Sequence, residues 1–268
     1  MNSIIITAIF ALALAFILGF ALGFFRKFFA VAEDPLKSSI RECLPGANCG
    51  ACGYPGCDGY ASALVERTAE PNKCTVGGVS VAEKIGTILG IEASSVESFI
   101  AVLACQGSKE HAPAKGEYSG LAQCRAAKIA IGGTKLCAWG CLGFGDCVAV
   151  CQFGALCMGA DGLPHINVER CTGCGLCVAE CPQQVLLTIP KRRKANPVPY
   201  ALCSNRHTVK ALVLKTCKKA CIKCELCVKN CPQHCIALVN GIPEIDYSKC
   251  SICGTCVAKC PTKVLQNI

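Results

Sequence analysis

The sequence predicts an α+β protein with a single N-terminal transmembrane helix, a small cysteine-rich module and two further cysteine-rich domains. Three observations predict this architecture. An uncharged apolar run opens the chain, four later cysteine runs each precede a short apolar stretch, and those runs fall into two pairs. Stretches such as "PQQVLLTI" and "PQHCIALV" are typical of short strands, and the pairing of the runs indicates an internal duplication.

The apolar run spans residues 3–25 and carries no charge. A helix needs about 20 apolar residues to cross a bilayer. A cleaved signal peptide usually has its basic residues before the apolar run, whereas Arg26 and Lys27 follow it here. The positive-inside rule then keeps everything downstream on the cytoplasmic side. We therefore expect an N-terminal membrane anchor.

The 27 cysteines fit either a disulfide-rich secreted scaffold or a metal-binding protein. They fall in tight CxxC and CxxCxxC runs, where neighbouring thiols converge well on a metal centre but are poorly placed to bridge one another. Long stretches with few cysteines are large enough to supply ordinary cores. The spacing therefore favours metal ligation in a reducing compartment.

The last two runs match the pattern that holds paired [4Fe–4S] clusters. In C-x2-C-x2-C-x3-C-P, three thiolates bind one cluster and the fourth binds its neighbour. Zinc ribbons lack the third CxxC thiolate and the Cys-Pro ending. The runs thus predict a ferredoxin-like dicluster domain with two sites. Site 4 would be formed by Cys221, Cys224, Cys227 and Cys260, and site 5 by Cys231, Cys250, Cys253 and Cys256.

The first pair of runs contains one regular half and one irregular half. "CTGCGLCVAECP" (171–182) fits the pattern, but "CAWGCLGFGDCVAVCQFGA" (137–155) has Phe144 where a second ligand is expected. Cys137 could supply that thiolate through a longer, glycine-rich loop. Alternatively, the irregular half binds nothing and Cys151 alone serves its neighbour. We expect site 2 from Cys137, Cys141, Cys147 and Cys181, and site 3 from Cys151, Cys171, Cys174 and Cys177.

A fifth cysteine set lies near the anchor, in "NCGACGYPGC" followed by "NKC". Its glycines allow tight turns and expose backbone N–H groups that can bond cluster sulfurs. The spacing alone would also suit zinc. Because the same chain has four other predicted cluster sites, [4Fe–4S] is favoured. This set, site 1, consists of Cys49, Cys52, Cys57 and Cys74.

Seven cysteines remain, namely Cys43, Cys105, Cys124, Cys157, Cys203, Cys217 and Cys235. Cys157 and Cys235 lie in apolar stretches and are expected to fill cores. Four others could hold a sixth cluster, although nothing local shows that they converge: Cys105, Cys124, Cys203 and Cys217. No histidine is expected as a ligand. We find no nucleotide-binding fingerprint, nucleophile elbow or paired-carboxylate site, so no catalytic residue is expected on this chain.

The net charge of +9 is concentrated between Lys191 and Lys229, where eleven Lys and Arg face one acid, Glu225. Such a local basic patch favours an acidic protein partner or anionic lipid headgroups. Nucleic acid is disfavoured, because no aromatic residues are interleaved with the charges. A solvated linker is the plainer interpretation.

These features predict four segments: an anchor at 1–27, an N-terminal [4Fe–4S] module at 28–80, and two ferredoxin-like segments. The first segment is 81–190 with its core at 134–190, and the second is 191–268 with its core at 212–268.

The order of anchor, "LPGANCGACGYPGC…C" and ferredoxin-type runs resembles the B subunit of the Rnf complex, and "KLCAWGCLGFGDCVAVCQFGA" resembles that family's own variant of the first site. The resemblance implies an electron-transfer subunit of a prokaryotic ion-translocating ferredoxin:NAD+ oxidoreductase. Such a protein would take electrons from soluble acidic ferredoxin and pass them to membrane partner subunits, which bind NAD and carry the ion path. It would lie at the cytoplasmic membrane with its Fe–S domains on the cytoplasmic side.

Two other functions remain open at this point. One is a ferredoxin-like subunit of another membrane oxidoreductase, which the "NCGACGYPGC" module argues against. The other is an Fe–S redox sensor, which would need one exposed cluster rather than a chain of about five.

Overall fold

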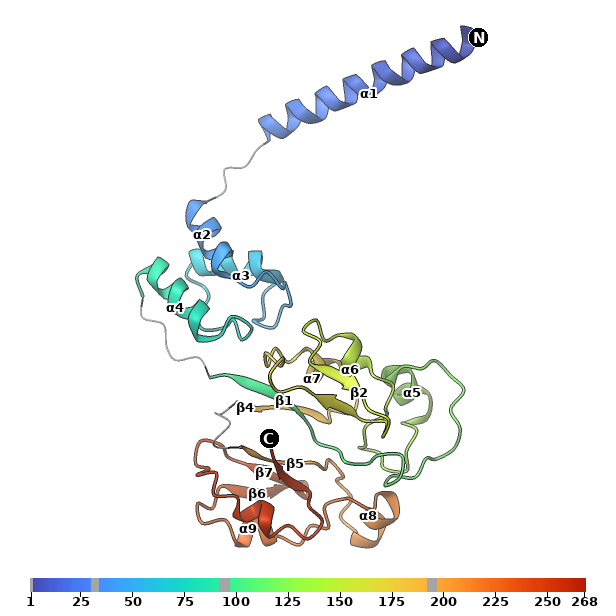
Figure 1. The fold of residues 1–268 in the computed structure, drawn as a ribbon, viewed down its shortest axis with the longest axis vertical. Helices are drawn as coiled ribbons and strands as arrows, with labels where there is room; N and C mark the ends of the chain where they lie inside the picture. The colour runs from blue at the N-terminus through green and yellow to red at the C-terminus, as the bar shows by residue number, and fades with distance from the viewer. Residues whose placement is uncertain (1, 30–33, 92–96, 192–196) are drawn as a thin grey trace.

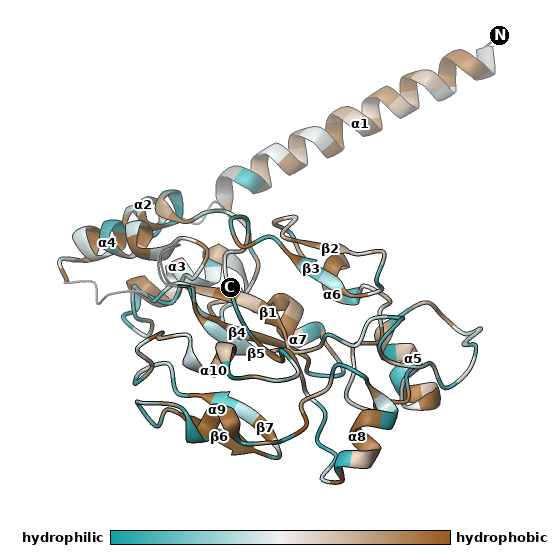
Figure 2. Cartoon of the chain, turned by 60° about the horizontal axis from the view of Figure 1, so that its bottom comes forward, coloured by the Kyte–Doolittle hydropathy of each residue, from teal (hydrophilic) through white to brown (hydrophobic). Residues whose placement is uncertain are grey.

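The computed structural model describes residues 2–29, 34–91, 97–191 and 197–268. Helix α1 (Asn2–Phe28) stands apart from the other elements in Figure 1, and Figure 2 shows apolar residues along most of its length. Its stretch Ile4–Arg26 has a mean hydropathy of 2.8, and its apolar window buries nothing against the rest of the described chain. A 23-residue helix is about 34 Å long, enough to cross a bilayer core. The structure thus contains the predicted candidate membrane helix.

Removing residues 2–26 should release the chain from membranes and leave its folded domains intact, because the apolar window of α1 does not pack on them. Each large apolar side chain moved from lipid into water costs about 1.5–3 kcal/mol. Fractionation of lysates from cells lacking the other subunits measures the effect, and the iron content of the released chain reports folding. A truncated chain that stays with the membranes would show that another segment anchors it.

Three helices form a compact N-terminal module: α2 (Pro35–Cys43), α3 (Gly56–Val65) and α4 (Gly78–Leu89). Asp34 caps α2 by accepting a hydrogen bond from the backbone N–H of Leu36 at 2.8 Å. Ile40, Leu64 and Ile85, one from each helix, are fully buried in one core. The expected boundary at residue 80 falls inside α4. Because α4 packs on α2, we propose a boundary near residue 91 instead.

The first ferredoxin-like segment contains two antiparallel strand pairs. Strand β1 (Phe99–Leu103) pairs with β4 (Leu186–Pro190), and β2 (Leu156–Met158) pairs with β3 (Pro164–Ile166). One helix precedes the first cysteine run, and each of the two runs contains one short helix: α5 (Cys124–Ile131), α6 (Asp146–Ala149) and α7 (Leu176–Glu180). Helix α5 ends at Gly132, which adopts the left-handed conformation.

The second segment repeats this arrangement (Figure 1). Strand β5 (Pro199–Ala201) pairs with β8 (Leu265–Asn267), and β6 (Ile236–Val239) pairs with β7 (Ile242–Ile245). Its helices follow the same order: α8 (Lys210–Thr216), α9 (Leu226–Lys229) and α10 (Thr255–Ala258). The repeat therefore extends beyond the cysteine runs, because a leading strand and helix precede each pair.

All four cysteine runs follow one backbone path, including the irregular one. In the irregular run, Cys141 and Cys147 correspond to the first and third cysteines of the regular runs. The second residue after each first position has positive φ, and so has the second residue before each third position. The first group is Gly143, Gly173, Lys223 and Ile252; the second is Gly145, Gly175, Glu225 and Gly254. The stretch 137–155 is therefore a genuine half of the dicluster fold despite its cysteine spacing.

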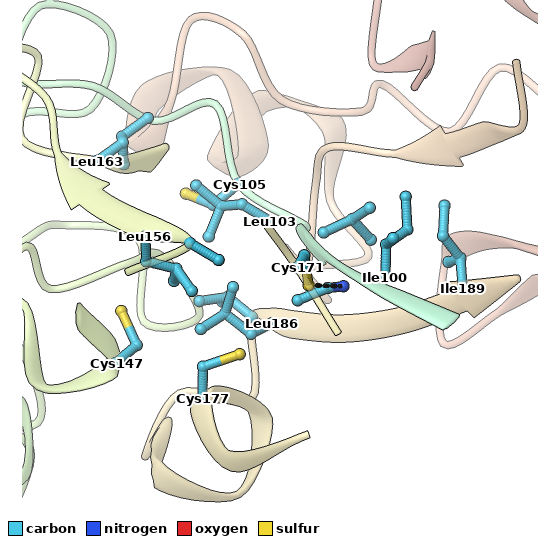
Figure 3. Packing of buried hydrophobic residues seen from close by; sticks show 14 of the residues in the cluster. Ile100, Leu103, Cys105, Cys147, Leu156, Leu163, Cys171, Cys177, Leu186 and Ile189 are labelled. Carbon is cyan, nitrogen blue, oxygen red and sulfur yellow. Dashed lines mark hydrogen bonds between the residues drawn. The ribbon is translucent and has the colours of Figure 1, made fainter. Parts of the chain in front are cut away.

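Strands and cysteine loops of the first segment share one core. Figure 3 shows Cys147, Cys171 and Cys177 among apolar side chains that include Ile100 and Leu186. The dashed line marks the backbone N–H of residue 101 donating to Cys171 Sγ at 3.4 Å. The ligand loops thus form part of the core and are not surface appendages.

Candidate iron–sulfur sites

The four cysteines expected for site 5 line one small cavity. Cys231, Cys250, Cys253 and Cys256 line it together with Cys235. No carboxylate or imidazole lines it, and an all-thiol donor set suits an iron–sulfur cluster rather than a hard cation. Among the described residues, no three His, Cys, Asp or Glu side chains approach closely enough to share one metal ion. A four-iron cube is larger than one ion, and its thiolates stand around a cavity of this kind.

The four cysteines of site 1 also lie together. Burial raises the pKa of Cys74, and the adjacent Cys52, Cys57 and Cys49 raise it further. The backbone N–H of Gly77 donates to Cys74 Sγ at 3.3 Å. In the described part of the chain, the hydroxyl of Thr75 is buried without a partner. A cluster sulfur would accept a hydrogen bond from that hydroxyl, so these residues fit the group.

The cysteines expected for site 3 lie near one another, and so do those expected for site 4. Burial raises the pKa of Cys177 to about 11, and the other three cysteines of site 3 contribute to the rise: Cys171, Cys174 and Cys151. Burial likewise raises the pKa of Cys221 in site 4, where Cys260 and Cys224 add to it. In each set the fourth cysteine comes from the opposite half. This placement would allow the ligand exchange that the spacing predicts.

Site 2 differs from the expectation at one position, because Cys124 lies where Cys137 was expected. One cavity is lined by Cys124, Cys141, Cys147 and Cys181. Burial raises the pKa of Cys147 to about 12, with Cys124 the next contributor. Cys137 does not line this cavity.

Local structure explains why Cys124, and not Cys137, lies in this cavity. The carboxylate of Asp146 accepts hydrogen bonds from the backbone N–H groups of Cys124 at 3.0 Å and Arg125 at 3.3 Å, which fixes the start of α5 on the ligand loop. Burial raises the pKa of Cys124, while backbone N–H groups of residues 144–146 lower it. The Cys124 thiol thus reaches the loop position where Phe144 replaces a ligand. Phe144 itself packs edge-on against Tyr118, with ring centroids 5.6 Å apart.

Cys137 lines a third cavity, which lies between the two ferredoxin-like segments. Four cysteines line it: Cys105, Cys137, Cys203 and Cys217. Of the four cysteines considered for a sixth cluster, three therefore lie together, and Cys124 belongs elsewhere. No histidine lines this cavity or those of sites 2 and 5.

Neighbouring sites come close enough to influence one another. Burial is the main cause that raises the pKa of Cys174 in site 3, and Cys49 of site 1 adds to it. Cys177 of site 3 similarly contributes to the raised pKa of Cys147 in site 2. Sites 1, 3 and 2 therefore follow one another in space.

The basic segment is only partly described. Arg192, Arg193 and Lys194 lie outside the described residues. Lys191 donates to the carbonyl of Val168 at 3.0 Å. Six further basic side chains of this segment are exposed: Arg206, Lys210, Lys215, Lys218, Lys219 and Lys229.

One of the two expected core cysteines is wrongly assigned. Cys235 is buried, with its Sγ 3.4 Å from that of Cys231. Cys157 is exposed, because the alternation along β2 turns Leu156 inward and its neighbour outward.

Three family models match the chain. The FeS model, for an Fe-S cluster, covers residues 44–76. A 4Fe-4S binding domain matches residues 164–187, and a 4Fe-4S dicluster domain matches residues 220–264. These ranges contain the cysteine runs of site 1, of the regular half of the first pair, and of the second pair.

Three relatives match most of the chain, and each is the B subunit of its complex. That of the Na(+)-translocating ferredoxin:NAD(+) oxidoreductase complex of Acetobacterium woodii is 45% identical over 90% of this chain and 71% of its own length. That of the ion-translocating oxidoreductase complex of Methanosarcina acetivorans is 41% identical over 99% of both chains. That of the proton-translocating ferredoxin:NAD(+) oxidoreductase complex of Clostridium ljungdahlii is 39% identical over 98% of this chain and 89% of the relative. With its anchor candidate, its Fe–S module and its two ferredoxin-like segments, this chain belongs to the B-subunit family of ion-translocating oxidoreductase (Rnf) complexes.

Proposed function

We propose that this chain carries electrons from soluble ferredoxin to membrane partner subunits of an ion-translocating ferredoxin:NAD+ oxidoreductase. The observation that carries the proposal is the match to B-subunit relatives across nearly the whole chain. The groups of buried cysteines support it, because they form a series of closely spaced sites. NAD and the translocated ion would be handled by the partner subunits.

Five ligand sets would hold [4Fe–4S] clusters. Sites 1, 3, 4 and 5 take the cysteines that the spacing predicts, and site 2 takes Cys124 in place of Cys137. The shared cavity and the hydrogen bonds of Asp146 support this revision. The clusters would supply one-electron transfer at potentials set by burial and hydrogen bonding.

The chain's own groups would adjust those potentials. Backbone N–H groups donate to the sulfurs of proposed ligands at equivalent places: residue 155 to Cys151 at 3.3 Å, and residue 264 to Cys260 at 3.3 Å. Such bonds favour the more negative, reduced state of a cluster. The apolar cores around Cys171 and Cys227 would exclude water from the clusters.

The Fe–S domains would lie on the cytoplasmic side, where ferredoxin is found. Arg26 and Lys27 support this orientation, since they directly follow the apolar run and the positive-inside rule applies to them. The membrane helix would hold site 1, the first site after it in sequence, close to the membrane partners.

Ferredoxin would dock on the basic surface of the second segment. Helix α8 presents Lys210 and Lys215 together with half-exposed Leu212 and Leu214. This combination suits an acidic partner with an apolar contact at its centre, because complementary charge mainly speeds encounter.

Replacing Lys210 and Lys215 by glutamate should raise the apparent KM for reduced ferredoxin about tenfold at low salt, and less at high salt where charges are screened. Anaerobic stopped-flow bleaching of cluster absorbance measures this. The control carries Lys84→Glu and Lys115→Glu, which reverse two exposed lysines outside the basic segment. Equal KM values for both double variants would contradict docking of ferredoxin on this basic surface. A native chain that ferredoxin does not reduce would contradict the proposed function.

A further inference from the structure

The cavity between the two ferredoxin-like segments has the features of the ligand sites. Like the cavity of site 2, it is lined by four cysteines. Its cysteines are 6–7% exposed and belong to none of sites 1 to 5: Cys105, Cys137, Cys203 and Cys217. Four buried thiols around one cavity form a donor set of the kind that holds a [4Fe–4S] cluster.

The internal duplication supplies these four thiols as two equivalent pairs. Cys105 and Cys203 each lie two residues beyond the leading strand of their segment, β1 or β5. Cys137 and Cys217 each lie four residues before the first cysteine of a dicluster run. Each segment therefore contributes one thiol after its strand and one before its run.

The hydrogen bonds repeat with the same symmetry. The backbone N–H of Cys141 donates to Cys105 Sγ at 3.4 Å, and that of Cys221 donates to Cys203 Sγ at 3.3 Å. Asn205, only 1% exposed, donates from Nδ2 to Cys137 Sγ at 3.6 Å. Donors aimed at sulfur stabilise thiolates, and such donors accompany cluster ligands.

Direct contacts between the segments hold the cavity together. Ser204 donates to the carbonyl of Trp139 at 2.8 Å, and the backbone N–H of Lys218 donates to the carbonyl of His111 at 2.9 Å. Gly107 lies beside thiols of both segments, because a Cβ there would lie 3.5 Å from Cys105 Sγ and 3.7 Å from Cys217 Sγ. The two thiols are thus already close across the segment boundary.

A buried cation lies beside this cavity. Lys135 is 7% exposed, and its Nζ donates to the carbonyl of Gly107 at 2.6 Å. Within the described part of the chain it has no carboxylate partner. Lysine is almost never buried without a paired anion, and thiolates around an iron–sulfur core would supply that negative charge.

We propose that Cys105, Cys137, Cys203 and Cys217 bind a sixth [4Fe–4S] cluster at the boundary between the two ferredoxin-like segments. This interdomain site rests on the proposed electron-transfer function and deepens it. Cys203 lies against Cys221 of site 4, and Cys105 lies against Cys141 of site 2. The interdomain cluster accepts one electron from site 4 and gives one electron to site 2, with no bond made or broken. The ligands each lose a proton when the cluster is assembled.

Iron counting on anaerobically purified full-length chain tests the assignment. Six clusters give about 24 iron atoms per chain, and each lost cluster removes about four. Cys203→Ala should remove about four iron atoms, whereas the exposed Cys157→Ala should remove none. Cys137→Ala with Cys203→Ala should remove only about four, because both residues serve one cluster. Cys137→Ala with Cys141→Ala should remove about eight, because they serve two.

Either of two iron counts would overturn the interdomain cluster: full iron content in Cys203→Ala, or a loss of only about four iron atoms in the Cys137/Cys141 double variant. Zinc bound in place of iron and lost with Cys203→Ala would overturn it too. Unchanged circular dichroism and unchanged EPR signals of sites 4 and 5 show that a variant has folded. Neither iron content nor EPR after chemical reduction involves ferredoxin, so a failure of the proposed function would not alter them.

Discussion

Loss of the interdomain cluster should divide the electron path into two parts. In the complex carrying Cys203→Ala and Cys217→Ala, reduced ferredoxin should still bleach sites 4 and 5, while sites 1, 2 and 3 stay oxidised. The reason is the order of the sites in space. The first segment's sites adjoin one another and site 1, and the interdomain cavity adjoins both Cys141 of site 2 and Cys221 of site 4. Ferredoxin-dependent NAD+ reduction should fall to background.

EPR after freeze-quenching measures which sites have been reduced. Dithionite, a small reductant that reaches clusters from any side, is the control and should reduce both groups of sites in the same variant. Cys157→Ala should behave as the native complex does, since that side chain is exposed on β2. Reduction of sites 1 to 3 by ferredoxin at the native rate would show that electrons cross between the segments by another route.

The regular cysteine runs made most of the fold predictable. Each C-x2-C-x2-C-x3-C-P pattern specifies a loop, a short helix and a following strand, because three ligands must wrap one cluster corner. The helix that ends at Gly132 and strand β1 (Phe99–Leu103) carry local signals too, a glycine pair and an apolar run. The length of the uncharged apolar run was enough to predict helix α1.

The role of Cys124 was not predictable from spacing. Phe144 shows that a ligand is missing from its loop, but the replacement comes from a helix that starts 20 residues earlier. Cys137 is nearer in sequence, and proximity favoured it. A tertiary contact determines which cysteine reaches the loop, because the carboxylate of Asp146 fixes the start of α5 there.

The interdomain cysteines did leave a signal in the sequence. "CAWGC" and "CKKAC" place a cysteine four residues before each first ligand, and "LAC" and "ALC" follow the two leading strands. Each pair is uninformative alone. Only the strand register, with Leu103 opposite Leu186 and Ala201 opposite Leu265, shows that the positions correspond.

The ligand loop of site 3 provides a prediction with a large effect on stability. Gly173 has φ +67°, and a Cβ there would collide with the carbonyl of Phe99 at the start of β1. Lys223 and Ile252 adopt the same conformation at equivalent positions, so the conformation itself is tolerated. The collision with the carbonyl of Phe99 is not tolerated in the same way, because the backbone of β1 must move to relieve it. Gly173→Ala should cost about 1–2 kcal/mol in left-handed strain and about 1–3 kcal/mol more in overpacking.

Gly175→Ala is the matched control, because that residue also has positive φ, +79°, but its Cβ would meet open space. It should cost only the left-handed strain of about 1–2 kcal/mol. Displacing β1 also pulls the backbone N–H of residue 101 from Cys171 Sγ, so Gly173→Ala should release iron from site 3 faster in guanidinium. Loss of visible absorbance over time measures both variants. If they lose iron at equal rates, β1 does not press on the ligand loop, and the stability of site 3 depends on loop conformation alone.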